Sequence, residues 1–142
     1  MRLLRVPGVH VPCSDTWLLA EAMAAEGVEG RDVADLCCGS GALAIAASRA
    51  GARSVLAVDV SLRAALATAL NVRLQRCRVR VRRGDLFGAL GDRQLDLIVC
   101  NPPYVPAATD ALPRHRSTTP LDGGRDGRAL IDRVCREAPG HL

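Results

Sequence analysis

Apolar and polar positions along the chain fall into blocks whose lengths and periods predict strands and helices in alternation. Short apolar runs over 32–38, 55–59 and 95–100 predict strands, and the alternation of arginine and valine over 78–82 predicts another. The arginine-rich strand is typical of a sheet edge, whereas the apolar run over 95–100 is typical of an interior strand.

Helices are predicted between these strands. Ser14 or Asp15 caps a helix that runs through Trp17 to about Glu26, and the nearly all-apolar segment 42–50 predicts a buried helix. Ser61 caps the next helix, and the apolar residues that recur there at helical spacing are Leu62, Ala65, Leu66, Ala69 and Leu70.

The last part of the chain combines a long loop with one more helix. The loop covers 105–125 and is rich in Pro, Thr, Gly and Arg, and the helix is predicted over 128–137. Repeated strand and helix units predict a single α/β domain over 1–142 with a doubly wound, mainly parallel sheet. Such sheets bind ligands at the carboxyl ends of their strands.

A rigid polar corner follows the apolar run that ends at Cys100. It consists of Asn101, Pro102, Pro103 and Tyr104. Each proline fixes its own φ and favours an extended predecessor, so two acceptors, the Asn101 carboxamide and the Pro102 carbonyl, are held at a defined separation. Two such acceptors hold both hydrogens of a planar NH2 group, and Tyr104 is suited to lie against its flat face. Taken alone, the corner also fits a simple turn.

A glycine loop is the second chemical feature. Gly39 and Gly41 stand between the strand that carries Asp35 and the following helix, so the backbone there can approach a ligand closely. Taken alone, this loop fits a tight turn equally well. Asp59 ends the next strand, where a carboxylate can accept both hydroxyls of a ribose, which suits a dinucleotide and an adenosyl cofactor alike.

Two further acids discriminate between these cofactors. Ala44 stands where a dinucleotide loop has its third small residue, so the loop alone leaves NAD open. Asp35, however, precedes the glycines, where its charge repels a pyrophosphate and attracts a cationic amino acid tail. Asp85 follows the arginine-rich strand and offers an acceptor for an adenine amino group. The set predicts S-adenosylmethionine.

With these motifs the chain resembles the class I S-adenosylmethionine-dependent methyltransferases, and among them the short protein-glutamine methyltransferases that modify translation release factors. The resemblance runs from 11–17 through the glycine loop to 101–104, and it includes the glycine-rich segment 123–128. It implies that the cofactor site is lined by Thr16, Asp35, Gly39, Asp59, Asp85, Leu86 and Asn101. It also implies that the target amide is held by Asn101, Pro102 and Tyr104.

Two departures from the family pattern stand out. The first position of the cofactor loop, often glycine in the family, is Cys37, which narrows the space for the methionine end. The family also continues past the last helix with three more strands, whereas this sequence ends at Leu142. If nothing follows Leu142, the strand over 95–100 forms an apolar edge that is a template for self-association. We therefore expect this sequence either to be part of a longer protein or to rely on a partner, such as a small partner subunit, that covers this edge.

Composition restricts the setting. The 142 residues are 49% hydrophobic, and no apolar stretch approaches the ~20 residues that cross a bilayer, so a cytoplasmic protein without membrane contact is expected. The net charge of +4 comes from arginine alone, and the arginine cluster fits a solvated sheet edge better than a nucleic-acid surface. The six cysteines show no metal-ligand spacing, so no metal site is predicted.

Three functions remain open at this stage. The first is methyl transfer to a side-chain amide nitrogen of a protein, with glutamine of a release factor as the expected substrate. The second is methylation of the exocyclic amine of adenine or guanine in nucleic acid, which requires the base to be extruded. The third is an inactive cofactor-binding or scaffolding domain.

Overall fold

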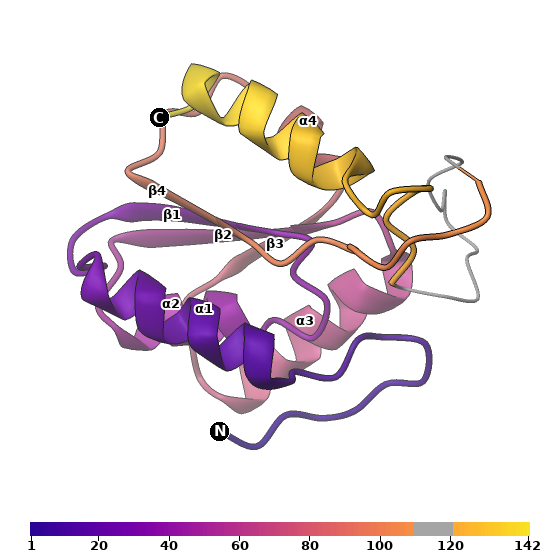
Figure 1. The fold of residues 1–142 in the computed structure, drawn as a ribbon. Coiled ribbons are helices and arrows are strands. Elements are labelled where there is room, and N and C mark those ends of the chain that lie inside the picture. The colour runs from indigo at the N-terminus through magenta and orange to yellow at the C-terminus, as the bar shows by residue number, and fades with distance from the viewer. Residues whose placement is uncertain (110–120) are drawn as a thin grey trace.

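The computed structural model describes residues 1–109 and 121–142 of the chain (Figure 1). Over these residues the order of elements confirms the predicted α/β alternation. The helices, 3-10 turns and strands are α1 (Ser14–Ala25), β1 (Asp32–Leu36), α2 (Ala42–Arg49), β2 (Ser54–Asp59), α3 (Leu62–Leu74), β3 (Arg80–Arg83), η1 (Leu86–Ala89), β4 (Leu97–Cys100), α4 (Ala129–Glu137) and η2 (Ala138–Gly140). No helix among the described residues is long and apolar enough to span a membrane.

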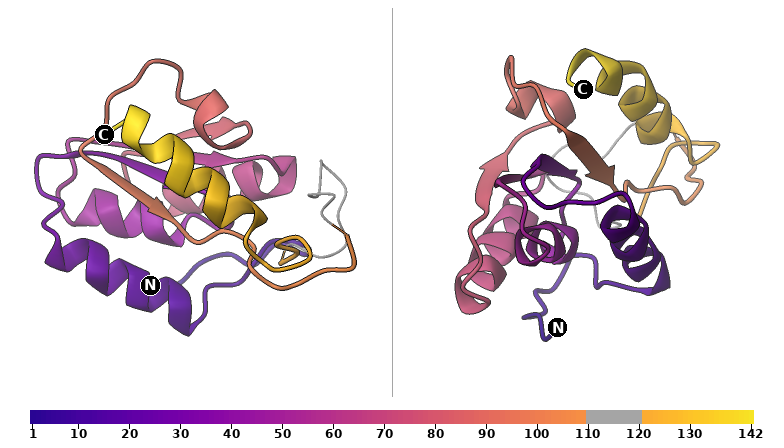
Figure 2. Two further views of the ribbon diagram at one scale, coloured as in Figure 1. Left: turned by 45° about the horizontal axis from the view of Figure 1, so that its top comes forward. Right: turned by 90° about the vertical axis from the view of Figure 1, so that its left-hand side faces the viewer.

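The four described strands form one parallel sheet in the order β3-β2-β1-β4. Helices α1, α2 and α3 cover one face, and α4 with η1 covers the other (Figures 1 and 2). In register, Leu36 at the end of β1 pairs with Val58 of β2 and Cys100 of β4. The loops after these strands therefore emerge together at one edge.

The central strands are apolar on both faces because both faces are covered. Val33 and Val55 pack into the cluster under α1 and α2, whereas Ala34 and Leu56 pack into the cluster under η1 and α4. Successive strand residues point to opposite faces, so a strand buried on both sides reads as a continuous apolar run. This is why the sequence pattern locates β1 and β2 correctly.

Several element boundaries differ from the sequence prediction: β1 ends at Leu36 and not at residue 38, and the ends of α2, β2 and α4 differ by one residue. Three further differences have a cause in the hydrogen bonds. Cys13, not Ser14 or Asp15, caps α1, because the Cys13 amide donates to the Thr16 hydroxyl at 3.4 Å and starts the helix earlier. Strand β3 begins two residues late, since the amide of Arg78 donates to Ser48 of α2 at 3.2 Å. The strand predicted over 95–100 is shortened in the same way, because the Leu95 amide donates to a carbonyl near the C-terminus.

The two edges of the described sheet are β3 and β4. The arginine-rich β3 lies at an edge, as predicted. Strand β4 has an apolar sequence typical of an interior strand, but it pairs with β1 alone among the described strands, as expected for a sequence without the later strands of the family. Self-association through the β4 edge stays a prediction.

Helix α3 is confirmed, and the Ser61 hydroxyl caps it by accepting the Ala64 amide at 3.4 Å. Its large apolar residues, however, do not face the sheet. The buried side of α3 consists of small or polar residues, namely Ala64, Ala65, Ala67, Thr68, Asn71 and Val72. Its leucines lie on the outer side, where all four are exposed.

Part of the long loop predicted over 105–125 lies outside the described residues, since 110–120 are not described. The described ends of this loop come together. Val105 forms an isolated parallel bridge with Asp122, and its amide donates to the Leu121 carbonyl at 2.9 Å.

Candidate functional site

The glycine loop after β1 is tied to the ends of two neighbouring elements. The Gly39 amide donates to the Asp59 carboxylate at the end of β2 at 2.9 Å. The Gly39 carbonyl accepts the Thr68 hydroxyl of α3, also at 2.9 Å. Gly41 has a φ of +83°, and a Cβ there would come within 2.8 Å of the Thr68 methyl. Position 41 therefore requires glycine for two reasons, its backbone conformation and its close packing against α3.

Asp59 joins two loops at the carboxyl edge of the sheet. One carboxylate oxygen accepts the Gly39 amide and the other accepts the Ser61 amide, each at 2.9 Å. Burial raises the pKa of Asp59 above the usual range, while these two hydrogen bonds lower it. Because each carboxylate oxygen has more than one lone-pair site, Asp59 keeps acceptor capacity for a ligand.

Asp35 is the most unusual acid of the described chain. It is fully buried in β1, and one oxygen accepts the Ala44 amide of α2 at 2.8 Å. Its other oxygen, Oδ1, is buried without a hydrogen-bond partner among the described residues. Burial raises the pKa of Asp35 to about 7, against the Ala44 hydrogen bond and with help from the charge of Asp59. An unpaired buried acceptor of this kind suits a cationic ligand group.

Cys37, the residue that departs from the family pattern, has a φ of +58°, a backbone conformation that favours glycine. Its thiol interacts with the thiol of Cys100, which ends the neighbouring strand β4. This interaction and burial raise the pKa of the Cys37 thiol well above its ordinary value. The thiol therefore stays protonated at neutral pH and behaves as a small apolar group, not as a nucleophile.

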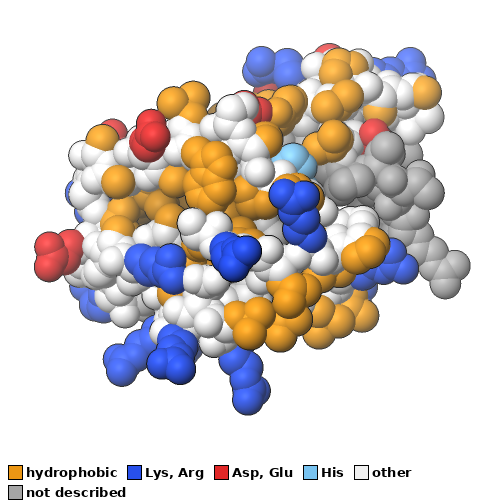
Figure 3. Space-filling view, turned by 90° about the horizontal axis from the view of Figure 1, so that it is seen from below, with side chains coloured by type: hydrophobic (Ala, Val, Ile, Leu, Met, Phe, Trp, Pro, Cys, Tyr) orange, Lys and Arg blue, Asp and Glu red, His pale blue; other side chains and the backbone are white. Residues whose placement is uncertain are grey.

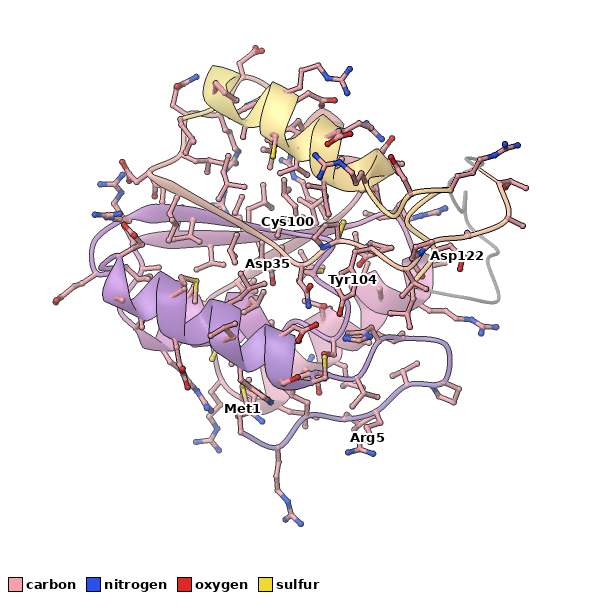
Figure 4. The ribbon with its side chains drawn as sticks, in the orientation of Figure 1. Met1, Arg5, Asp35, Cys100, Tyr104 and Asp122 are labelled. Carbon is pink, nitrogen blue, oxygen red and sulfur yellow. The ribbon has the colours of Figure 1, made fainter. Side chains whose placement is uncertain are left out.

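The corner after β4 is held against the first turn of α1. The Asn101 amide nitrogen donates to the hydroxyl of buried Thr16 at 3.4 Å. The Tyr104 hydroxyl donates to the Asp15 carboxylate, and this bond raises the pKa of Tyr104. Asp35, Cys100 and Tyr104 lie around the end of β4 (Figure 4). Since the amide nitrogen of Asn101 is engaged, its carbonyl oxygen is the group left to accept a ligand hydrogen.

A separate segment, 121–127, braces the same corner from outside. The Gly123 amide donates to the Val105 carbonyl at 2.8 Å, and the Gly124 carbonyl accepts the Ala107 amide at 2.9 Å. A Cβ on Gly123 would come within 2.8 Å of the Pro103 carbonyl oxygen. A Cβ on Gly127 would overlap the Tyr104 carbonyl oxygen. Both glycines are thus required for the brace to lie directly on the backbone of the corner.

Asp85 and Leu86 follow β3 at the same edge of the sheet. The Gly84 amide donates to the Asp59 carbonyl at 2.9 Å, which places Asp85 beside the end of β2. Leu86 is buried with a φ of +43°. The Asp85 carboxylate forms an ion pair with Arg133 of α4, at 3.1 Å and 3.2 Å to its two oxygens. Sequence reasoning did not identify Arg133, because the spacing of 48 residues carries no local signal.

The N-terminal segment also reaches the glycine loop, although the sequence predicts no catalytic or binding role for its His10. The His10 side chain lies near Gly39, and its Nε2 is 3.8 Å from the Cys13 sulfur. A hollow of about 300 Å³ between this segment and α1 borders Trp17 and Ser40. The acids at the ends of β2 and β3 do not line this hollow, so it lies beside the glycine loop and not over these acids.

The predicted site residues therefore gather at one sheet edge in two linked groups. The first joins Gly39 to Asp59 and continues to Asp85, and the second joins Asn101 to Thr16. No cluster of three potential metal ligands occurs among the described residues. Buried acceptors and a glycine turn together fit a ligand with a cationic amine and a ribose, which are both parts of S-adenosylmethionine.

Comparison with known families agrees with this geometry. Residues 13–113 match the family described as methyltransferase small domain. The chain belongs to this family. It is thus a member of the class I S-adenosylmethionine-dependent methyltransferases, as the resemblance in sequence implied, and its fold class is confirmed.

Among the individual relatives within this family are two glutamine methyltransferases. A ribosomal protein uL3 glutamine methyltransferase of Bradyrhizobium diazoefficiens is 47% identical over 117 residues, which cover 78% of this chain and 37% of that protein. A release factor glutamine methyltransferase of Geobacter sulfurreducens is 36% identical over 142 residues, covering 96% and 50%. The crystal structure of a ribosomal protein L11 methylase from Lactobacillus delbrueckii superposes with a TM-score of 0.68 at 29% identity, covering 96% and 58%.

The chain spans between about a third and a half of the two curated relatives named above.

Proposed function

We propose that this chain provides the cofactor site and the amide site of an S-adenosylmethionine-dependent protein-glutamine N-methyltransferase. One observation carries the proposal. The Asn101 corner is anchored to Thr16 and braced by 121–127 at the end of β4, which pairs with β1, the strand that carries the buried carboxylate of Asp35. An amide-binding corner and a cofactor loop thus share one sheet edge.

The cofactor side is assigned to the acids and the glycine loop. The unpaired oxygen of Asp35 accepts the cationic amine, Asp59 accepts the ribose hydroxyls, and Asp85 with Leu86 holds the adenine. Thr16 and Gly39 complete the wall, and Gly41 allows the turn into α2. When bound, the cofactor supplies an electrophilic methyl group on a sulfonium.

The amide side is assigned to the corner after β4. The carbonyl oxygens of Asn101 and Pro102 accept the two hydrogens of the substrate NH2 group, and Tyr104 lies against its plane. An amide nitrogen is a poor nucleophile because its lone pair is delocalised into the carbonyl. Accepting both hydrogens raises electron density on nitrogen and orients its lone pair, so catalysis comes from positioning and not from a strong base. The surplus proton leaves to solvent after transfer.

The relatives support a glutamine of a translation protein as the substrate. The uL3 glutamine methyltransferase is more similar in sequence than the release factor enzyme, at 47% against 36% identity. We therefore favour ribosomal protein uL3 over a release factor, which changes the expectation from sequence alone.

The test is a labelling experiment with the protein and S-adenosylmethionine that carries a labelled methyl group. Purified uL3, a purified release factor and total RNA are offered together, and the products are separated and digested. Label on a glutamine nitrogen of uL3 is the expected result. Label on the release factor would retain the reaction and change the substrate, whereas label on RNA alone would favour the exocyclic amine activity.

A further inference from the structure

The outer side of α3 is apolar in a way that the fold does not use. Its leucines recur every fourth residue along the whole helix, with exposed fractions of 52% for Leu62, 61% for Leu66, 43% for Leu70 and 56% for Leu74. Four residues advance 400° around a helix, so the row turns by only 40° per step and stays on one side. We call this row the leucine row.

The inner side of α3 does not need these leucines. Alanines and other small residues face the sheet, because Thr68 closes on the glycine loop and Asn71 is buried beneath the N-terminal segment. Asn71 exchanges two hydrogen bonds with the backbone of Leu4, at 2.7 Å and 3.2 Å. The glycine loop lies so close to α3 that large side chains do not fit between them. In the isolated chain the leucines of α3 therefore face solvent.

The charged residues of α3, β3 and the segment between them are all positive. From 60 to 84 the sequence contains no Asp or Glu, and all seven of its arginines are exposed, namely Arg63, Arg73, Arg76, Arg78, Arg80, Arg82 and Arg83. Arg63 and Arg73 lie on the same arc of α3 as the leucines. Figure 3 shows hydrophobic and arginine side chains side by side on this face.

We propose that this face binds an acidic amphipathic helix of a partner protein. A row of side chains four residues apart is the surface against which the ridges of another helix pack. The uniform positive charge selects carboxylates on both sides of the partner's apolar stripe and disfavours a second copy of this basic face. Nucleic acid would satisfy the arginines but would leave the leucines without an apolar partner. The proposal does not rest on the chemistry of the strand-end site.

The probe is a fluorescein-labelled stapled peptide helix with leucine at every fourth position and glutamate on both flanks. Its binding to the protein is followed by fluorescence anisotropy. A second peptide has lysine at every glutamate position. We expect saturable binding of the acidic peptide and at least about tenfold weaker binding of the basic one.

Variants of the protein test whether the acidic peptide binds at the leucine row. The double substitution Leu66→Ser with Leu70→Ser should weaken acidic-peptide binding at least about tenfold. It should leave the melting temperature within about 2 °C, since surface changes outside the core have small effects on stability. Leu18→Ser is the matched control, because Leu18 is 68% exposed but lies on α1, and it should change affinity less than about twofold.

Charge reversal gives the sharpest result. Arg63→Glu with Arg73→Glu places two acids on the helix that carries the leucine row, so it should reduce the preference for the acidic over the basic peptide at least about tenfold. Equal binding of both peptides to the wild-type protein, or no saturable binding, overturns the proposal. The proposal is also overturned if phosphatidylglycerol vesicles or single-stranded RNA displace the labelled peptide as well as the unlabelled acidic peptide does. A wild-type dimer in sedimentation that Leu66→Ser with Leu70→Ser dissociates would assign the face to a second copy and also overturn it.

Discussion

The loops after β1 and β4 reach the same edge of the sheet but are held in different ways. The loop after β1 is fixed from within, because half-buried Asp59 accepts an amide of the loop and buried Asp35 accepts an amide of the following helix. The corner after β4 is fixed from outside, by Thr16 of α1 and by the segment 121–127. In the proposed assignment, cofactor binding thus depends on the central fold, whereas amide binding depends on segments distant in sequence. Substitutions in the two loops should separate the two functions.

The largest effect is expected for Asn101→Ala. Removing the carboxamide acceptor should lower the rate of methyl transfer by about a thousandfold, because positioning of the amide is the main source of catalysis. Cofactor affinity should change less than about threefold, since the other contacts to the cofactor are retained. Gln94→Ala is the control, because it removes an exposed carboxamide that bonds Gly140, before the start of β4. Equal losses of binding and turnover would contradict the separation.

Gly127→Ala should break the external brace. Gly127 has a φ of +74°, and an added Cβ overlaps the Tyr104 carbonyl oxygen. The strained backbone and the displaced corner should lower the free energy of unfolding by about 2 kcal/mol or more. Urea denaturation measures this loss, and Gly88→Ala is the control, because no atom lies within 4 Å of a Cβ there. Turnover should fall more than cofactor affinity, and the reverse order would show that the brace serves the cofactor loop.

Asp35→Asn should raise the melting temperature and lower the cofactor affinity at high pH, so the two effects can be told apart by their pH dependence. Because the folded pKa of Asp35 is about 7 and the ordinary value is 3.8, the folded state keeps the proton over that interval while the unfolded state loses it. Asp35 therefore contributes stability below pH 3.8 that is lost as pH rises towards 7. The variant should melt about 3–6 °C higher than wild type at pH 8 and show no such gain at pH 4.

The same substitution should weaken cofactor binding about 10- to 100-fold at pH 8, because the charge that accepts the cationic amine is lost. Wild-type affinity should also fall as pH drops below 7, since Asp35 is then protonated. The variant's affinity should not follow this pH dependence. A pH profile shared by wild type and Asp35→Asn would contradict the role of Asp35.

The smallest effect is expected for Arg133→Gln. This change releases Asp85 from its ion pair with α4 and leaves the carboxylate free to move. Side chains at this pair are partly exposed, so cofactor affinity should fall only about two- to fivefold. Calorimetric titration measures the change, with Arg136→Gln on the same helix as the control. A gain in affinity would show that the ion pair competes with the adenine for Asp85.

Much of this architecture can be predicted from local sequence. Apolar runs of strand length locate β1, β2 and β4, and the glycines and the acids at strand ends locate the cofactor loop. Each of these residues lies next to a strand end in the sequence. Because a parallel sheet brings the carboxyl ends of its strands to one edge, such residues come together there without any further signal. The Asn101 corner is found for the same reason, since its prolines follow a strand directly.

The rest depends on distant contacts that no local pattern encodes. The anchoring of Asn101 by Thr16 spans 85 residues, and the pairing of Arg133 with Asp85 spans 48. Helical spacing identifies α3 correctly but does not show which side faces the sheet. Close approach of the backbone at Gly41 and the hydrogen bonds of Asn71 decide that side, and they leave the leucine row outside.

In the proposed function, the edge formed by β1, β2 and β4 binds an adenosyl cofactor beside an amide-binding corner. Calorimetric titration of the protein at pH 8 with S-adenosylmethionine, and separately with NAD, tests it most directly. We expect saturable binding of S-adenosylmethionine at one site per chain, lost in Asp59→Ala and retained in Asn101→Ala. Absence of binding, or equal binding of NAD, would contradict it.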